Sequence, residues 1–171
     1  MAMGSHQKRG QGEKVWLTPS ELVKALGPFD LDPCFGSPRP WDTAACHLGP
    51  DAAGGMGGLF EEWHGFVWCN PPYDQEVGKW LARCADHGDG IALIFARTET
   101  AEFHSQVWGR ADAVFFFRGR IEFCLPTGAR PGHTGGAPSV LVCYGQRAVD
   151  RVKAAGMDGK LIILDRGNGH E

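Results

Sequence analysis

The chain of 171 residues lacks the features that define several large classes of proteins. It has no apolar run as long as a membrane span, and its polar start contains no signal-peptide core, so we expect no membrane partner. Its six cysteines show no paired spacing, and several lie inside apolar runs, where cysteine behaves as a small hydrophobic residue. This pattern fits a reducing cytoplasm better than a disulfide framework.

The chain also lacks a strong charge. A net charge of −3 and an isoelectric point near 6.1 argue against strong non-specific binding of nucleic acid. Basic residues nevertheless gather in one stretch, where only Glu122 opposes Arg118, Arg120, Arg130 and His133. This stretch is either a face for phosphates or an ordinary solvated surface, and the sequence leaves both open.

Length and composition predict one domain over residues 13–171, after a tail at 1–12 that is flexible or was added for expression. Thr18 to Glu21 has the pattern of a helix capping box. Strands alternating with helices predict an α/β fold with a mostly parallel sheet and an antiparallel C-terminal strand pair. The expected strands are 29–32, 66–69, 91–95, 113–117, 121–125, 140–144 and 161–164, and the expected helices begin near 18, 74, 99 and 146. Residues 33–58 are expected to form a long loop.

The most informative motif is Asn70-Pro71-Pro72-Tyr73, which follows an apolar strand and precedes a helical pattern. Neither proline can donate a backbone hydrogen bond or continue a sheet ladder, so the strand ends in a stiff turn with free carbonyl groups. The Asn70 side-chain oxygen and the Pro71 carbonyl can accept the two hydrogens of a planar amine, and Tyr73 can stack on its ring. Such acceptors stabilise positive charge that develops on the nitrogen during attack on an electrophile.

A cofactor is expected at the carboxyl ends of neighbouring strands. The dinucleotide fingerprint G-x-G-x-x-G is absent after the first expected strand, which ends at Asp32-Pro33-Cys34 instead. A carboxylate at a strand tip suits a cofactor with an ammonium group and ribose hydroxyls, as in S-adenosylmethionine. Asp32 is the first candidate and Asp30 the second, although an aspartate before proline is also a common turn former.

With both strand ends in view, the chain resembles the phage-type DNA N6-adenine methyltransferase (Dam) family. The matching segments, in chain order, are Trp16 to Pro19, Phe29 to Cys34, Trp63 to Tyr73, Ala96 to Thr100 with Phe103-His104, Arg118 to Phe123, and Ala137 to Val140. The resemblance implies a compact Rossmann-like methyltransferase fold, S-adenosylmethionine as methyl donor and adenine N6 in DNA as acceptor. It also implies a phage or prophage origin and the cytoplasm of a bacterial host.

The resemblance further implies roles for individual residues. The cofactor would lie near Trp16, Thr18, Pro19, Asp30, Asp32, Pro33, Cys34 and Asn70. The flipped or single-stranded adenine would enter the motif Asn70, Pro71, Pro72, Tyr73. DNA contacts are expected from Arg97, Arg120, Arg130 and His133, the last two in the loop 126–138. For Arg97 and Arg120, ion pairs with Glu99 or Glu122 are an equal alternative. No metal ligands are implied, and we expect a monomer or weak dimer.

One departure from the family pattern bears on function. The family often has Asp-Gly-Leu where this chain has Gly57-Gly58-Leu59, so a carboxylate that can contact the cofactor adenine is missing. A catalytically silent binding protein with the same fold therefore stays an alternative. A methyltransferase for RNA or for a protein glutamine is another, because the motif can hold any planar amide or amine. A zinc protein is a third, weaker alternative, since no C-x2-C pair accompanies Cys46-His47, His64 and Cys69.

Overall fold

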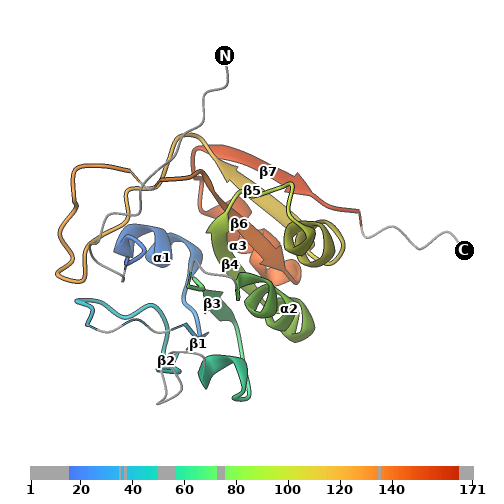
Figure 1. The fold of residues 1–171 in the computed structure, drawn as a ribbon, viewed down its shortest axis with the longest axis horizontal. Helices are drawn as coiled ribbons and strands as arrows, with labels where there is room; N and C mark the ends of the chain where they lie inside the picture. The colour runs from blue at the N-terminus through green and yellow to red at the C-terminus, as the bar shows by residue number, and fades with distance from the viewer. Residues whose placement is uncertain are drawn as a thin grey trace, which may run out of the picture.

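The structure is a computed structural model that describes residues 16–34, 36, 38–49, 57–72, 76–134 and 136–165. Its centre is a seven-stranded sheet with the order β2-β1-β3-β4-β6-β5-β7 (Figure 1). The strands are β1 (Leu31–Asp32), β2 (Cys46–His47), β3 (Val67–Cys69), β4 (Gly90–Phe95), β5 (Ala113–Phe117), β6 (Ser139–Tyr144) and β7 (Gly159–Ile163). The expected mixed α/β class is confirmed.

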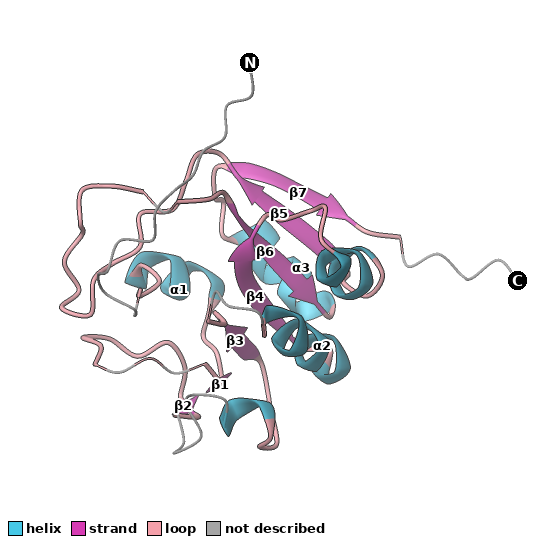
Figure 2. Cartoon of the chain, viewed as in Figure 1, coloured by secondary structure: helices cyan, strands magenta, loops and turns pink. Residues whose placement is uncertain are grey.

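Helices cover both faces of this sheet (Figure 2). The helical segments are α1 (Ser20–Leu26), η1 (Gly57–Leu59), α2 (Val77–His87), η2 (Phe103–Trp108) and α3 (Gln146–Ala154). Apolar residues of α1 and α3 pack in one core cluster, and those of α2 and η2 pack in another. Side chains alternate along β4 between the two clusters: Ile91 and Leu93 join the first, Ala92 and Ile94 the second. A strand covered on both faces needs this continuous apolar run. None of the helices in the described ranges is long and apolar enough to cross a bilayer.

The sheet is parallel on one side and antiparallel on the other. The pairs β1–β2, β1–β3 and β3–β4 are parallel, whereas β4–β6, β5–β6 and β5–β7 are antiparallel. The expected mostly parallel sheet is therefore correct only for the N-terminal half. Because β4 and β5 both run opposite to β6, they share one direction, and the carboxyl ends of β1 to β5 all lie at one edge of the sheet.

The order in which successive strands are added to the sheet reverses at β1. The chain first adds β2 on one side of β1, then crosses to add β3 on the other side and continues outward to β4. In open α/β sheets, the crevice outside the carboxyl ends of the strands at such a switch point is where ligands bind. Here the switch point lies between β1 and β3, the strands that end at Asp32 and Cys69.

The expected strand at 121–125 is wrong. Cys124 forms only an isolated antiparallel bridge with Leu17. Its expected partner, β6, already has β4 on one side and β5 on the other, and β5 is bordered in turn by β6 and β7. No ladder position beside β6 or β5 is therefore open to residues 121–125, although Ile121 and Phe123 still reach the core.

The expected capping box is wrong as well. Helix α1 begins at Ser20 with Pro19 at its N-cap, and no side chain caps it. Thr18 accepts a hydrogen bond from Asn70 instead, and Glu21 pairs with Arg130. Two further differences are β2, which lies within the expected long loop, and η2, which is a π-helix rather than an ordinary helix.

Candidate functional site

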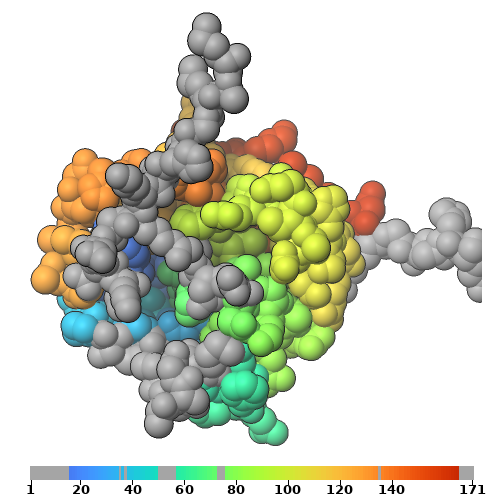
Figure 3. Space-filling model, in the orientation of Figure 1, coloured from blue at the N-terminus to red at the C-terminus, as the bar shows by residue number. Residues whose placement is uncertain are grey.

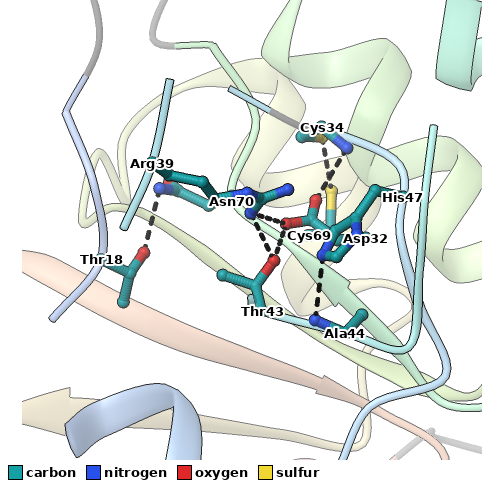
Figure 4. A network of polar contacts seen from close by, with 9 residues as sticks. All are labelled: Thr18, Asp32, Cys34, Arg39, Thr43, Ala44, His47, Cys69 and Asn70. Atoms are coloured by element: carbon teal, nitrogen blue, oxygen red, sulfur yellow. Dashed lines mark hydrogen bonds and ion pairs between the residues drawn. The ribbon is translucent and has the colours of Figure 1, made fainter. Parts of the chain in front are cut away.

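Three distant segments meet at the carboxyl ends of β1 and β3 (Figure 4). The Asn70 Nδ2 atom donates a hydrogen bond of 3.1 Å to Thr18 Oγ1, 52 residues away. The Cys34 and Cys69 sulfur atoms lie 3.5 Å apart. The structure therefore brings together Thr18, Asp32, Cys34 and Asn70, which the sequence placed in one site.

The Asn70 corner lies between the core and the surface. Asn70 is half-buried, Pro71 is buried and Pro72 is exposed. Thr18 is only 3% exposed, and its hydroxyl oxygen accepts the hydrogen bond from the Asn70 side-chain amide. This bond fixes the rotation of that amide. Tyr73, the fourth residue of the motif, lies outside the described residues. The described part of the corner is thus not sealed inside the core.

The Asp32 carboxylate is buried and fully engaged. Asp32 is 4% exposed. Its Oδ1 atom accepts a hydrogen bond of 2.9 Å from the Cys34 backbone N–H. Its Oδ2 atom accepts one from the Thr43 hydroxyl and lies 3.3 Å from Nη1 of Arg39. The same Nη1 donates to Thr43 Oγ1 at 2.7 Å. Asp32 thus has a cation as a close partner.

Sequence analysis missed Arg39 and Thr43. Both lie in the segment 38–45, which is part of the long loop expected at 33–58 and in which no individual residue was assigned a role. The one indication in the sequence is that Arg39 is the first cation after Asp32 and stands between two prolines. Nothing local says that it folds back onto Asp32, because the contact spans seven residues of irregular chain.

Burial sets the protonation of several groups here. Burial lowers the pKa of Arg39, and the neighbouring Asp32 carboxylate opposes that shift. Burial and the Arg39 charge lower the pKa of His47, which pairs with Asp32 in the register of β1 and β2. Burial raises the pKa of the Cys34 thiol to about 11, so this group is a neutral thiol near pH 7.

The other proposed cofactor residues divide into two sets. Pro19 and Pro33 are buried beside the site residues Thr18 and Asp32. Asp30 lies at the opposite end of β1, where its Oδ2 accepts a 2.7 Å hydrogen bond from the Phe66 backbone N–H. Trp16 packs against the α1-side core and contacts the His133 ring edge-on at 6.1 Å. The structure therefore does not bring Asp30 or Trp16 into the Asp32 group.

The segment that departs from the family pattern lies against this group. A Cβ atom added to Gly58 would come within 2.0 Å of the Pro33 carbonyl oxygen. The Gly58 carbonyl accepts a 2.6 Å hydrogen bond from Trp63 Nε1. Residues 57–59 are thus fixed directly beside the turn that follows β1.

The proposed DNA-contacting arginines follow two strand ends at the same edge. Arg97 comes after β4 and Arg120 after β5, and both are exposed. Arg130 pairs with Glu21 of α1 and lies 3.6 Å from Glu122. For Arg97 and Arg120, contact with DNA and ion pairing with Glu99 or Glu122 both remain as interpretations.

The loop 126–138 packs toward the site. A Cβ atom added to Gly128 would lie 2.8 Å from Pro40 and 3.0 Å from Trp41. Figure 3 shows the orange atoms of this loop and the cyan atoms near residue 40 on the same side of the molecule. The loop and the Arg39 segment therefore adjoin each other.

A further polar group is buried at this edge. Ser139, at the start of β6, is 4% exposed, and its hydroxyl has no hydrogen-bond partner among the described residues. A shallow hollow of about 450 Å³ lies between α1 and residues 42–45, and its lining includes Thr43 but neither Asp32 nor Asn70. Among the described residues, no group of three or more histidine, cysteine or acidic side chains has a metal-binding arrangement.

Comparison of the chain with protein-family models, with curated proteins and with solved structures gives no match.

Proposed function

We propose that this protein is an S-adenosylmethionine-dependent DNA N6-adenine methyltransferase with a compact Rossmann-like fold. The observation that carries the proposal is the meeting of Thr18, Asp32 and Asn70 at the β1–β3 switch point. These residues belong to three separate segments on which the family resemblance rests. Their convergence at the ligand-binding edge of an α/β sheet is what such an enzyme needs.

Asn70 and Pro71 would hold the target amine. The Asn70 amide is oriented by Thr18 at 3.1 Å, and an amide does not titrate, so it can act only as a fixed acceptor and donor. Together with the Pro71 carbonyl it would accept the two amine hydrogens and favour a pyramidal nitrogen. This interaction strengthens as positive charge develops, so it lowers the barrier rather than only tightening binding.

Asp32 would hold the ammonium group of the cofactor. The fit of a cation to this place is supported by Arg39, whose guanidinium lies 3.3 Å from the buried carboxylate. Thr18 and Cys34 would border the rest of the methionine part. When bound, S-adenosylmethionine would supply an electrophilic methyl group.

The DNA strand would lie along the same edge. Because β4 and β5 share a direction, exposed Arg97 and Arg120 stand at the edge that also carries Asn70. Cations spaced along that edge suit the phosphates on either side of an extruded nucleotide.

The test is labelled methyl transfer to DNA, to RNA and to protein by the purified chain, followed by mapping of modified adenines in DNA from cells that express it. We expect N6-methyladenine in DNA only. Transfer to RNA or to protein glutamine would replace the proposed substrate with that class. Absence of transfer to all three, together with absence of cofactor binding by calorimetry, would overturn the proposal.

One observation favours the second candidate, a silent protein of the same fold. Both Asp32 carboxylate oxygens already have partners within the chain, from Cys34, Thr43 and Arg39. In a silent protein this network would be permanent. The calorimetric experiment separates the two candidates, because only the methyltransferase must bind the cofactor.

A further inference from the structure

The two edges of the sheet differ in what they offer to another strand. At one edge, β2 has two half-buried residues and so presents little backbone. At the other edge, β7 pairs with β5 over five residues in an unbroken register, and Figure 1 shows it as the outer border of the sheet. Edge strands are commonly protected by shortness, bulges, proline or charges, and of these β7 has only the charge of Lys160.

Backbone groups on the outer side of β7 are placed to form a new ladder. The Asp158 carbonyl and the Leu164 N–H bond to the residues that flank β5, in the register of that pair. Because hydrogen-bonded residues alternate in an antiparallel ladder, the even-numbered residues of β7 bond to β5. The N–H and C=O groups of Leu161 and Ile163 therefore point outward, where no described segment pairs with them.

Exposed side chains of β7 are apolar on both faces of the sheet. Ile162 is 40% exposed and Ile163 is 52% exposed. Because successive side chains of a strand point to opposite faces, these two isoleucines leave apolar surface on each side of the edge. An open edge of this kind is a template for pairing with another strand.

We propose that two copies of this chain associate through β7, antiparallel and about a twofold axis that passes beside Ile162. A twofold axis normal to the sheet keeps each face on its own side, so Leu161 of one copy meets Ile163 of the other through their outward backbone groups. The same register sets Ile162 opposite its own copy. Leu161 and both exposed isoleucines thereby gain apolar cross-strand partners.

Neighbouring registers fit less well. A shift of one pairing step in one direction sets Lys160 opposite Ile162, and a shift in the other direction sets Asp165 opposite Leu161. In the proposed register Lys160 faces Leu164, so no like charges stand directly opposite each other.

A second copy is the occupant that the symmetry of this edge favours, because one strand supplies both halves of the ladder. Each copy has one β7 edge, so the pairing closes at two. Two five-residue strands bury less than the roughly 1,200 Å² of stable interfaces, so the dimer is weak and depends on concentration. The twofold axis turns the carboxyl-end edge of the second copy to the opposite side. Neither candidate site is covered, and the inference does not depend on the proposed function.

The experiment combines sedimentation equilibrium with cysteine cross-linking of the full chain. Wild type should show an average mass that rises with concentration from 18.6 kDa toward twice that value, with a Kd on the order of 10 µM. Ile162→Cys should form an interchain disulfide under mild oxidation, because opposed residues of a non-hydrogen-bonded pair lie about 4.5 Å apart, within disulfide reach. Lys160→Cys, on the same face of the same strand, is the matched control and should cross-link at least about 10-fold more slowly. Wild type, with its own six cysteines, gives the background.

A second variant tests the outward backbone groups. Ile163→Pro removes an N–H that points away from β5, which a proline at a sheet edge permits. By symmetry the dimer loses two hydrogen bonds, so its Kd should rise at least about 10-fold. Thermal unfolding shows whether this variant is folded, and if it is not, the two cysteine variants decide alone.

Four outcomes would overturn the proposal. They are a wild-type monomer at every concentration, an unchanged Kd in folded Ile163→Pro, equal cross-linking of the two cysteine variants, and assemblies larger than two copies. Each of them would leave the proposed function standing, because the candidate sites lie outside this interface.

Discussion

The two halves of the sheet differ in strand length and in what lies at their ends. In the parallel half, β1, β2 and β3 have two, two and three residues. In the antiparallel half, β5, β6 and β7 have five or six, and every residue of β6 is buried. Short strands end while still inside the domain, so the polar residues after them are held near the core. The parallel half thus carries the Asp32–Asn70 group, whereas β5 and β6 of the antiparallel half contribute long buried apolar stretches to the core.

The largest expected effect concerns activity in the parallel half. Asn70→Ala removes the acceptor that Thr18 orients, so methyl transfer should fall by about 10²- to 10³-fold or more, the usual cost of losing an oriented transition-state contact. Cofactor affinity should stay within a few-fold of wild type. Single-turnover transfer and calorimetry measure the two. Turnover close to wild type would remove Asn70 from its catalytic role.

The next effect concerns stability in the antiparallel half. Leu141 is fully buried in the centre of β6, so Leu141→Ala should lower the free energy of unfolding by about 2–5 kcal/mol. Urea denaturation measures this. Cofactor affinity, measured well below the melting temperature, should not change. A large loss of affinity in the folded variant would contradict the division between the two halves.

A third substitution should lower cofactor affinity, which Leu141→Ala should leave unchanged. Gly58→Ala places a methyl group within 2.0 Å of the Pro33 carbonyl oxygen, a contact that forces the turn after β1 to move. Cofactor affinity should fall about 10-fold or more, since displacements of 1 Å at a site are costly. Gly119→Ala is the control: it meets no atom within 4 Å but has a φ of +81°, so it should cost only about 1 kcal/mol of stability. Equal affinity in the two variants would argue against the site at Pro33.

A smaller effect is expected at Ser139, where the two halves adjoin. Its buried hydroxyl has no partner among the described residues, so Ser139→Ala should leave the free energy of unfolding unchanged or raise it by about 1 kcal/mol. Thr18→Val, which breaks a hydrogen bond to Asn70, should lower it by about 1 kcal/mol. Denaturant titrations compare the two variants. Clear destabilisation by Ser139→Ala would show that the hydroxyl has a partner.

The smallest effect is a pH dependence from β2. Burial and Arg39 lower the pKa of His47 below its ordinary value of 6.5, so the unfolded chain binds a proton more readily than the folded one. Stability from this group is present above pH 6.5 and is lost as the pH falls from that value toward the lowered folded pKa. His47→Gln should reduce the stability difference between pH 7.5 and pH 5.5, whereas exposed His64→Gln should not. An unchanged difference in His47→Gln would exclude this group as its source.

Sequence patterns predicted much of the fold because strands covered on both faces are continuous apolar runs, which are easily recognised in the sequence. The strands β3 to β7 lie within one to two residues of the expected positions. The strand expected at 121–125 failed because alternation of apolar residues shows burial but not whether a ladder partner is available. The capping box failed because its two side chains found partners elsewhere, Thr18 with Asn70 and Glu21 with Arg130.

The candidate site was predicted in part for a similar reason. Asp32 ends one expected strand and Asn70 follows another, and the carboxyl ends of parallel strands share an edge, so the strand pattern predicted both residues at one edge of the sheet. That β1 and β3 are neighbours there was decided by the tertiary structure. Asp30, the second candidate, stands just before β1, at the end of that strand away from the site, where it accepts a hydrogen bond from the Phe66 backbone N–H. Arg39 and Thr43 were missed because irregular chain has no periodicity from which a contact can be inferred.

The sequence by itself determined which segments are apolar strands and which polar residues stand at their ends, since both depend on neighbours along the chain. Only the tertiary structure decided the order of the strands, the antiparallel insertion of β6 between β4 and β5, and the approach of Arg39 to Asp32. These depend on which surfaces and charges are left to be buried or paired once the whole chain is packed, and no local pattern contains that information.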